Sequence, residues 1–378
     1  MPEAMTIGVD IGGTKVAAGL VDSHGNISHK TRVPMVAAGD AAAGFASVQN
    51  AVEALFREAP GAQGSVKGIG LCSPGPLDPL TGIVLNPPNV PCWRNFPLAT
   101  ETERAFGVPA RVDNDANAAG LAEALWGAGA GYSNVFYATL GTGIGTGIVF
   151  NNRIYHGRTG SAAEGGHVTI DYHGPKCGCG KRGCIEAFCS GPAIAARARA
   201  GGRPGYLTAV QVAEAWREGD MVATRVLEDT ADLLTVWLGN IVNVLEPDVM
   251  VISGGMSELM SAFFGRIRQT LPAWSINPRA HEIPLVIARY GADAGVAGAA
   301  SLCSRPDSDP SRTLGNYLQP RAIETEPGQL MLTTDYERSS TKTGTSSVGW
   351  SGCKVAHYVE YSLGQPSAGV AELGLYST

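Results

Sequence analysis

The sequence has no cluster of basic residues and no long apolar segment. Its 28 Lys and Arg are outnumbered by 34 Asp and Glu, which gives a formal net charge of -6 at pH 7. An acidic chain without a Lys/Arg-rich run has no general attraction for nucleic acid or for an anionic membrane. Gly, Asn or Pro interrupts the longest apolar runs well before membrane-spanning length. We therefore expect no nucleic acid and no membrane among the partners.

The first residues, MPEAMTIGVD, lack the basic and then apolar pattern of a secretory signal peptide. Eight cysteines in 378 residues do not resemble a disulfide mini-scaffold, and four of them crowd into one segment, at positions 177, 179, 184 and 189. Both observations favour a cytoplasmic protein whose thiols are reduced, some of them bound to a metal.

Glycine is abundant, with 50 residues, and it occurs in short motifs between apolar runs. This distribution indicates backbone-geometry positions such as tight turns and phosphate-binding loops, and not a low-complexity tract. With 378 residues and 44% hydrophobic content, the chain can bury a large core and is long enough for two domains.

Two stretches follow the same scheme of apolar strand, Gly/Thr turn and apolar strand. The first is TIGVDIGGTKVAAGLVD and the second is SNVFYATLGTGIGTGIVFNNRIY. The segments 41–59 and 209–245 have helical apolar spacing, and VKGIGLCSPGPL, VPARVDND and PDVMVISGGM read as further strands. The repeated device predicts a duplicated α/β architecture with a cleft between two halves.

The Gly/Thr turns are candidate phosphate sites. In DIGGTK, residues without Cβ let backbone N–H groups approach a phosphate, the Thr14 hydroxyl adds a donor, and Asp10 can act on Mg²⁺ directly or through water. Each turn alone is a weak signal, because most glycine hairpins bind nothing. LGTGIGTG is followed by a strand and not by a helix, which argues against a dinucleotide-binding motif. As a pair, the turns predict a site for the β- and γ-phosphates of ATP.

Asp115 follows a strand and begins a probable helix, where a carboxylate is held rigidly. The alternative role for an acidic residue at this place is a helix cap. Because Asn114 stands beside it, one residue can cap while the other faces a ligand. Phosphoryl transfer requires positioning, charge neutralisation and a base near the attacking hydroxyl, and we predict that Asp115 is that base.

The stretch HVTIDYHGPKCGCGKRGCIEA supplies three thiols and an imidazole from His167, Cys177, Cys179 and Cys184. Three sulfurs and one nitrogen complete a tetrahedral zinc shell with no open position, so the predicted site is structural. A redox pair is the competing interpretation, but the spacing is not the CxxC of thioredoxins. Cys189 is expected to pack as a small hydrophobe.

A closed metal site here would hold two nearby carboxylates, Glu164 and Glu186, at defined positions. Such a pair suits recognition of several hydroxyls on one polyol, whereas the ordinary fate of a Glu is the solvated surface. His156 and His173 have no comparable context, and we expect them to be surface or satisfied structural histidines.

Together, DIGGTK, VDNDANAAGLAE, LGTGIGTG, AAEGGH and CGCGKRGCIEA closely resemble the ROK family of bacterial sugar kinases, particularly its glucokinases, over about residues 5–303. The cysteine element is the specific part. The resemblance implies an actin-like, ribonuclease H-like duplicated fold with two domains around a cleft. It also implies ATP and Mg²⁺, a structural zinc ion and commonly a homodimer.

The resemblance also implies a role for each matching position. Asp115 matches the base that takes a proton from a sugar hydroxyl. The implied sugar-binding positions are Asn89, Asn114, Asp115, Glu164, His167 and Glu186. The implied zinc ligands are His167, Cys177, Cys179 and Cys184. The implied nucleotide and phosphate positions, with Asp10 beside them, are Gly12, Gly13, Thr14, Thr142, Gly143, Gly254 and Gly255.

Two features depart from the family pattern. The usual glycine before the sugar-binding Glu is Ala163 here, and the chain after Cys303 has no recognised counterpart. We expect a smaller lobe of residues 1–118 and about 292–304, a larger lobe of residues 119–291 with the zinc loop, and an appended segment, 305–378.

We read the chain as an ATP-dependent hexose kinase, with glucose phosphorylated at its C6 hydroxyl as the leading prediction. A kinase for an N-acetylhexosamine or fructose is the nearest alternative, because the carboxylates that bind hydroxyls would be shared. A sugar-responsive regulator of the same family is disfavoured, since only nine residues precede Asp10 and no helix-turn-helix fits there. A non-catalytic sugar-binding protein is a further alternative.

Overall fold

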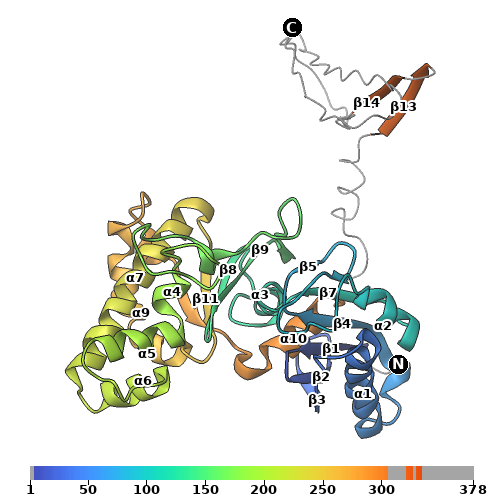
Figure 1. The fold of residues 1–378 in the computed structure, drawn as a ribbon, viewed down its shortest axis with the longest axis horizontal. Coiled ribbons are helices and arrows are strands. Elements are labelled where there is room, and N and C mark those ends of the chain that lie inside the picture. Colours follow the sequence, from blue (N-terminus) through green and yellow to red (C-terminus); the bar gives the residue numbers. More distant parts are fainter. Residues whose placement is uncertain (1–3, 305–320, 327–328, 334–378) are drawn as a thin grey trace, which may run out of the picture. The chain divides into compact units, whose positions relative to one another are not determined.

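In a computed structural model, residues 4–304, 321–326 and 329–333 are described (Figure 1). The chain divides into two compact units, Met1–Pro306 and Asp307–Thr378. In the second unit, β13 (Arg321–Glu326) pairs antiparallel with β14 (Gln329–Thr333), so one of the two short strands predicted in this segment is present. The other, VAHYVEYSL, lies outside the described residues.

The first half of unit 1 contains a five-stranded sheet with the order β3-β2-β1-β4-β7. β2 is antiparallel to both β1 and β3, whereas β4 is parallel to β1 and β7 is parallel to β4. The strands are β1 (Met5–Ile11), β2 (Lys15–Val21), β3 (Ile27–Pro34), β4 (Val66–Ser73) and β7 (Ala110–Asn114). A separate hairpin joins β5 (Leu77–Asp78) to β6 (Ile83–Val84).

The second half of unit 1 repeats this topology in the order β10-β9-β8-β11-β12. β9 is antiparallel to β8 and β10, whereas β11 is parallel to β8 and to β12. The strands are β8 (Asn134–Leu140), β9 (Ile144–Phe150), β10 (Arg153–Ile154), β11 (Val249–Ser253) and β12 (Leu285–Ile287). Both sheets therefore place their first strand at the centre, which confirms the predicted duplication.

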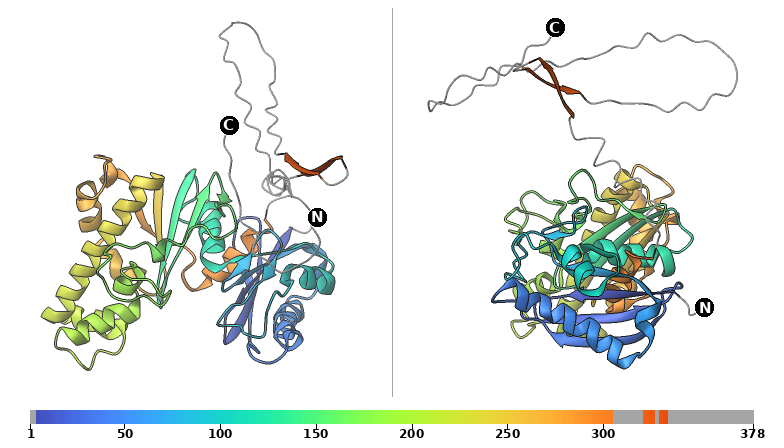
Figure 2. Two further views of the ribbon diagram at one scale, coloured as in Figure 1. Left: turned by 45° about the horizontal axis from the view of Figure 1, so that its top comes forward. Right: turned by 90° about the vertical axis from the view of Figure 1, so that its right-hand side faces the viewer.

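Two helices, α3 (Asp115–Trp126) and α10 (Ala294–Ser301), lie between the two sheets (Figures 1 and 2). α3 contacts strands of both sheets, and α10 contacts α3 and the first sheet. On the first sheet, α1 (Ala41–Glu58) packs on β1 to β3 and α2 (Leu98–Phe106) packs on β7. The remaining α-helices accompany the second sheet: α4 (Glu186–Cys189), α5 (Gly191–Ala200), α6 (Ala209–Arg217), α7 (Met221–Leu245), α8 (Ser257–Ser261) and α9 (Phe264–Thr270).

Five short 3₁₀ helices occur in unit 1: η1 (Ala62–Ser65), η2 (Gly165–His167), η3 (Leu271–Ala273), η4 (Ala280–Glu282) and η5 (Gly291–Asp293). Within the described residues, no helix combines the length and the apolar character needed to cross a membrane.

Alternation along the central strands explains why helices cover both faces of each sheet. In β8, Phe136 and Leu140 belong to the core under α5 to α9, while Val135 and Tyr137 belong to the core around α3 and α10. Successive side chains of a strand point to opposite faces, so an all-apolar strand must be covered on both sides. Because helices cover both faces of each sheet, a ligand-binding site can form only at the loops that follow the strand ends.

The structure contains the predicted helices and strands, but one helical segment is divided in two and one strand is shorter than predicted. The helical segment 209–245 is interrupted between Arg217 and Met221, where Asp220 caps α7 through its side chain. The strand predicted over residues 66–77 ends at Ser73, because Pro74 and Pro76 have no N–H group for the sheet.

Candidate active site

The first glycine turn joins β1 to β2 and places Asp10 near the end of β1. A hydrogen bond from Gly12 N–H to the Lys15 carbonyl closes the turn at 2.9 Å. The start of α10 packs against this strand end so closely that a Cβ at Gly295 would lie 2.5 Å from the Asp10 carboxyl carbon. The Asp10 carboxylate is thus fixed between a strand and a helix.

Two carboxylates interact at this strand end. Burial raises the pKa of Asp10, and the charge of Asp115 raises it further, while Lys15 and Arg32 act in the opposite direction. The Asp115 side chain touches solvent, yet protein surrounds it on most sides, and this desolvation raises its pKa against the hydrogen bond from Ala116 N–H. Paired, partly desolvated carboxylates of this kind are typical of functional sites.

Asn114 and Asp115 divide the two roles that the sequence left open. The Asn114 side chain caps α3 by accepting hydrogen bonds from the N–H groups of Ala116 at 2.9 Å and Asn117 at 3.4 Å. Because Asn114 supplies the cap, the Asp115 carboxylate is not required for it. Asp115 is the first residue of the helix and keeps one carboxylate oxygen without a hydrogen bond among the described residues.

Asn89 lies against the first turn. A Cβ at Gly13 would stand 2.6 Å from the Asn89 carbonyl oxygen. The exposed Thr14 hydroxyl and the half-buried Gly12 complete the turn. The structure therefore brings Asn89 together with the DIGGTK turn, although 75 positions separate Asn89 from Thr14 along the chain.

The second and third glycine turns meet at the ends of β8 and β11. A hydrogen bond of 3.0 Å from Gly141 N–H to the Gly143 carbonyl closes the second turn, which includes the exposed Thr142. Gly254 has a φ of 89°, and a Cβ there would lie 2.3 Å from the Leu140 carbonyl, so only glycine fits. Gly255 follows with open space around it. The third turn also bonds to the end of β8, because Met256 N–H donates to the Leu140 carbonyl at 3.0 Å.

Glu186 connects the second turn to the cysteine loop. Its Oε2 accepts a hydrogen bond from Ile144 N–H at 2.9 Å, and a Cβ at Gly143 would approach the same oxygen to 2.6 Å. Its Oε1 lies 3.6 Å from Cys177 Sγ and 3.9 Å from His167 Nδ1. A single carboxylate therefore contacts both the turn and the loop.

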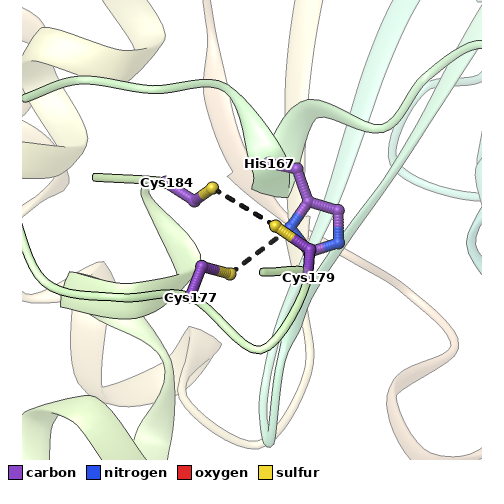
Figure 3. Close-up of side chains that lie close together, drawn as sticks. All are labelled: His167, Cys177, Cys179 and Cys184. Atoms are coloured by element: carbon purple, nitrogen blue, oxygen red, sulfur yellow. Dashed lines mark hydrogen bonds between the residues drawn. The ribbon is translucent and has the colours of Figure 1, made fainter. Parts of the chain in front are cut away.

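The four predicted metal ligands form one cluster (Figure 3). Their ligand atoms all lie within 4.8 Å of one another, with Cys177 Sγ 3.7 Å from His167 Nδ1 and Cys179 Sγ 3.7 Å from Cys184 Sγ. Around a tetrahedral zinc ion with Zn–S bonds of about 2.3 Å, sulfur atoms stand about 3.8 Å apart. The donor set and its spacing therefore fit such an ion.

Cys189, the fourth cysteine of this segment, lies apart from the cluster. It is buried in the core of the second half, with Sγ 3.8 Å from the Thr230 carbonyl. The prediction that it packs as a small hydrophobe is confirmed.

Glu164 stands on a segment that is anchored on both sides. The Thr146 hydroxyl bonds to the Ala163 carbonyl and accepts a hydrogen bond from Gly165 N–H at 2.7 Å, and Trp237 Nε1 donates to the Gly165 carbonyl at 3.0 Å. The Glu164 side chain is exposed and makes no hydrogen bond within the described part of the chain. It is held at its backbone and available at its carboxylate.

Ala163 has a φ of 64°, in the left-handed region that glycine adopts freely. This is the position at which the resembling family has glycine. The alanine therefore keeps the backbone geometry that precedes Glu164, at a cost of about 1–2 kcal/mol.

The sequence reasoning missed two features near Asp10 and Asp115. The first is the packing of Gly295 on Asp10. The two glycines of the run GADAG could have indicated a close approach of the backbone at this place. The second feature is the partner of His156, whose Nε2 lies 2.6 Å from Asp113 Oδ2, so His156 is a satisfied structural histidine as expected, but the contact with Asp113 was not predicted. These two residues are 43 positions apart, and nothing in the sequence links His156 to the motif VDNDANAAGLAE that contains Asp113. His173 is exposed, which is also as expected.

Comparison with known proteins gives one family. The model of the ROK family matches residues 6–305. Glucokinase from Thermotoga maritima is 34% identical over 316 residues, which cover 80% of this chain and 98% of that protein. Two solved structures align with about four fifths of the chain. The ROK family glucokinase from Streptomyces griseus, in complex with glucose and AMPPNP, has 32% identity, a TM-score of 0.66, and 79% of this chain and 99% of that chain covered. The ROK hexokinase from Thermus thermophilus has 35% identity, a TM-score of 0.68, and 79% and 97% covered.

Other relatives have different printed functions. N-acetyl-D-glucosamine kinase from Pasteurella multocida is 31% identical, with 79% of this chain and 99% of that protein covered. A putative xylose repressor from Caldicellulosiruptor is 30% identical, with 66% of each covered. The family match, the structural likeness and the repeated sheet order confirm the predicted duplicated, actin-like α/β fold.

Proposed function

Because the chain belongs to the ROK family, we propose that it is an ATP-dependent hexose kinase that phosphorylates glucose at the C6 hydroxyl. The observation that carries the proposal is the meeting of Asp10 and Asp115 at the strand ends of the first sheet, where each is desolvated and Asp115 acts electrostatically on Asp10. The carboxylate of Asp10 suits a magnesium ion that holds the phosphates, and the carboxylate of Asp115 suits a general base. The glucokinase relatives support glucose as the substrate.

Asp115 is the proposed base. Desolvation raises its pKa, which makes the carboxylate a stronger proton acceptor than an ordinary Asp. In turnover it takes the proton of the attacking hydroxyl. Its place at the start of α3, fixed by the Asn114 cap, holds the accepting oxygen still while the sugar is bound.

The sugar-binding residues come from both halves. Asn89 and Asn114 belong to the first half, whereas Glu164 and His167 belong to the loop after β10 in the second half and Glu186 begins α4 at the end of that loop. Amide groups and carboxylates together donate to and accept from several hydroxyls, which orients one hydroxyl toward Asp115. We propose that residues 1–118 with 292–304 and residues 119–291 form two lobes that close on the sugar and exclude water.

The glycine turns are the proposed phosphate sites. In the first turn, Gly13 and Thr14 are the proposed donors of N–H groups and a hydroxyl, while the N–H group of Gly12 closes the turn. Thr142 and Gly143 are the proposed donors of the second turn, and Gly254 and Gly255 are proposed to lie on the nucleotide side. Asp10 is the residue that would hold Mg²⁺, directly or through water. When bound, Mg²⁺ neutralises charge on the phosphate oxygens.

His167, Cys177, Cys179 and Cys184 would hold a structural zinc ion. His167 faces the cluster with Nδ1, which leaves Nε2 for a hydroxyl of the sugar. Because Glu186 contacts the same cluster, the metal site would set the position of this sugar-binding carboxylate.

A coupled assay of ADP release tests the proposal. Purified protein is mixed with ATP and Mg²⁺ and with glucose, N-acetylglucosamine, N-acetylmannosamine, fructose or mannose. Preference for glucose is the expected result. Preference for N-acetylglucosamine would favour the second candidate, which the relative from Pasteurella supports. If no sugar stimulates ADP release from folded, zinc-loaded protein, the kinase proposal fails, and a regulatory or binding role, as the repressor relative suggests, replaces it.

A further inference from the structure

A hydrogen bond between the side chains of His156 and Asp113 joins the two halves of unit 1 beside the proposed base. Asp113 is the fourth residue of β7 in the first sheet, and His156 follows β10 of the second sheet. Nε2 and Oδ2 lie 2.6 Å apart, and the side chains are 24% and 4% exposed, respectively. A buried carboxylate needs such partners, because leaving it unpaired away from water is costly.

Asp113 controls the backbone around Asp115. Its Oδ1 accepts hydrogen bonds from Asn114 N–H at 2.7 Å and from Asn117 Nδ2 at 3.2 Å. Asn114 and Asn117 flank Asp115 on either side, the first as the cap and the second in the first turn of α3. A carboxylate only accepts hydrogen bonds, so Nε2 of His156 is the donor in this contact. Withdrawing it would leave one oxygen of Asp113 unsatisfied in the interior.

His156 also fixes the segment that carries Glu164. Its carbonyl accepts a hydrogen bond from Ala162 N–H at 3.1 Å, which closes a turn ending two residues before Glu164. The turn is tight, since a Cβ at Gly157 would lie 2.9 Å from Ala162 Cβ. The same turn touches the first half again, because a Cβ at Gly160 would lie 2.6 Å from Pro79 Cδ.

We propose that His156 is a positioning residue that sets the spacing between the Glu164 segment and the strand end bearing Asn114 and Asp115. The inference rests on the proposed function, in which Glu164 holds the sugar that Asp115 deprotonates. A continuous set of hydrogen bonds runs from Ala162 through His156 and Asp113 to Asn114. Glu164 lies in the loop after β10 and Asp115 begins the helix after β7, so this bridge fixes a distance that neither sheet fixes alone.

Steady-state kinetics of three variants test the role. His156→Leu removes the donor, His156→Gln keeps an N–H group near the position of Nε2, and His29→Leu is the matched control on the exposed face of β3. For His156→Leu, we expect kcat/KM for the sugar to fall about tenfold to a hundredfold, because a shift of the order of 1 Å has that effect on a reaction. The KM for ATP should stay at the wild-type value. His156→Gln should recover most of the loss, and His29→Leu should match wild type.

The contact itself is tested without activity. Urea unfolding of His156→Leu, Asp113→Asn and the double variant forms a cycle, in which the single effects should fail to add because the residues touch. If His156→Leu does not fold, His156→Asn replaces it. The asparagine side chain is polar, but it is too short to place its amide group where Nε2 of His156 bonds to Asp113.

The outcomes separate the two proposals. Wild-type protein that phosphorylates no sugar would overturn the proposed function and with it any role of His156 in turnover. An active wild type whose His156→Leu variant keeps normal kinetics would overturn the positioning role alone. Loss in His156→Leu that His156→Gln does not restore, or strictly additive unfolding effects, would also overturn it.

Discussion

The two halves of unit 1 have the same strand order but obtain their acidic side chains in different ways. In the first half, Asp10 is the sixth residue of β1, and Asp115 begins the helix after β7. The corresponding sixth residue of β8 is Thr139, and its partner on β11 is Ser253, where Asp10 has Cys72. The strand ends that supply carboxylates in one half are uncharged in the other.

The second half obtains its carboxylates from the long segment between β10 and α4, which contains Glu164, and from the start of α4, where Glu186 stands. Residues 155–185 contain one short 3₁₀ helix and the isolated bridges Thr169–Cys184 and Lys176–Arg182. A loop of this length without its own sheet or helix needs other support. Thr146, Trp237 and the His/Cys cluster supply it.

The comparison indicates where rigidity comes from in each half. A carboxylate on a central strand is positioned by the hydrogen bonds of the sheet, whereas a carboxylate on a loop is positioned by cross-links between side chains. Substitutions in the first half should therefore change chemistry and leave geometry intact, and substitutions in the loop should change binding through geometry.

The largest expected effect is that of Asp115→Asn. Removing only the base should lower kcat by about 10²- to 10⁴-fold, while sugar binding and the fold remain, because Asn114 still caps α3. Coupled ADP release, sugar titration by calorimetry and thermal unfolding give the three readouts. Near-normal turnover, or an unfolded variant, would contradict the assignment.

The pH dependence of the same reaction is a second readout for wild type. Desolvation raises the pKa of Asp115, so the base form is lost as pH falls through a value above the ordinary Asp range. We expect kcat/KM for the sugar to decline on the acidic side from that raised pKa. A limb at the ordinary pKa of Asp, near 3.9, would show that the desolvation has no effect on the base.

Cys179→Ser is the corresponding change in the loop. It should abolish stoichiometric zinc and raise the KM for the sugar about tenfold to a hundredfold, because Glu164 and Glu186 lose their support. Metal analysis and kinetics measure both, and chelation of wild-type protein should give the same loss. Cys92→Ser, outside the cluster, is the control for metal content. Unchanged zinc in Cys179→Ser would show that the cluster is not the metal site.

Asp10→Asn is expected to raise stability while it lowers turnover. Burial and the charge of Asp115 raise the pKa of Asp10, so the folded protein binds this proton more tightly than the unfolded chain. The free energy of unfolding therefore falls as pH rises through the raised pKa, and an uncharged Asn escapes this loss. Urea unfolding should find the variant more stable than wild type at neutral pH, with the difference closing in acid.

Asp22→Asn is the matched control, for which we expect the opposite change in the free energy of unfolding. The pKa of Asp22 is lowered, because the hydrogen bonds from Asn26 and His24 outweigh its desolvation. Its ionised form therefore contributes stability at neutral pH that is lost in acid. If Asp10→Asn and Asp22→Asn shift the stability in the same direction at neutral pH, the electrostatic account of the first half is wrong.

The smallest expected effect is at Ala163, where the loop carries backbone strain. Ala163→Gly relieves the φ of 64° but adds freedom to the unfolded chain, so we expect a net gain of about 0.5–1 kcal/mol. Ala162→Gly, at a position without positive φ, should lose about 0.4–1 kcal/mol for the same entropic reason. If urea unfolding shows that both variants change the free energy of unfolding in the same direction, strain at Ala163 is excluded.

Local chemistry made several parts of this protein predictable from its sequence. The turns at Gly12 and Gly141 were predicted because glycines between two apolar strands usually form a tight turn. Helix α1 was predicted from its helical spacing, and the start of α3 from a capping residue. The His/Cys cluster was predicted because its ligands are close in sequence, so a short loop brings them together.

Tertiary structure alone decided the contacts between segments that are distant in sequence. His156 pairs with Asp113, Gly295 packs on Asp10, and Glu186 bonds to Ile144, each because sheet order and helix packing placed two strand ends or loops together. The sequence by itself determined which residues can carry chemistry, since charge, thiols and glycine are local properties, and it is from these that the site residues are predicted. Which of them face one another depends on long-range packing, since a burial pattern gives the direction of a side chain but not its partner.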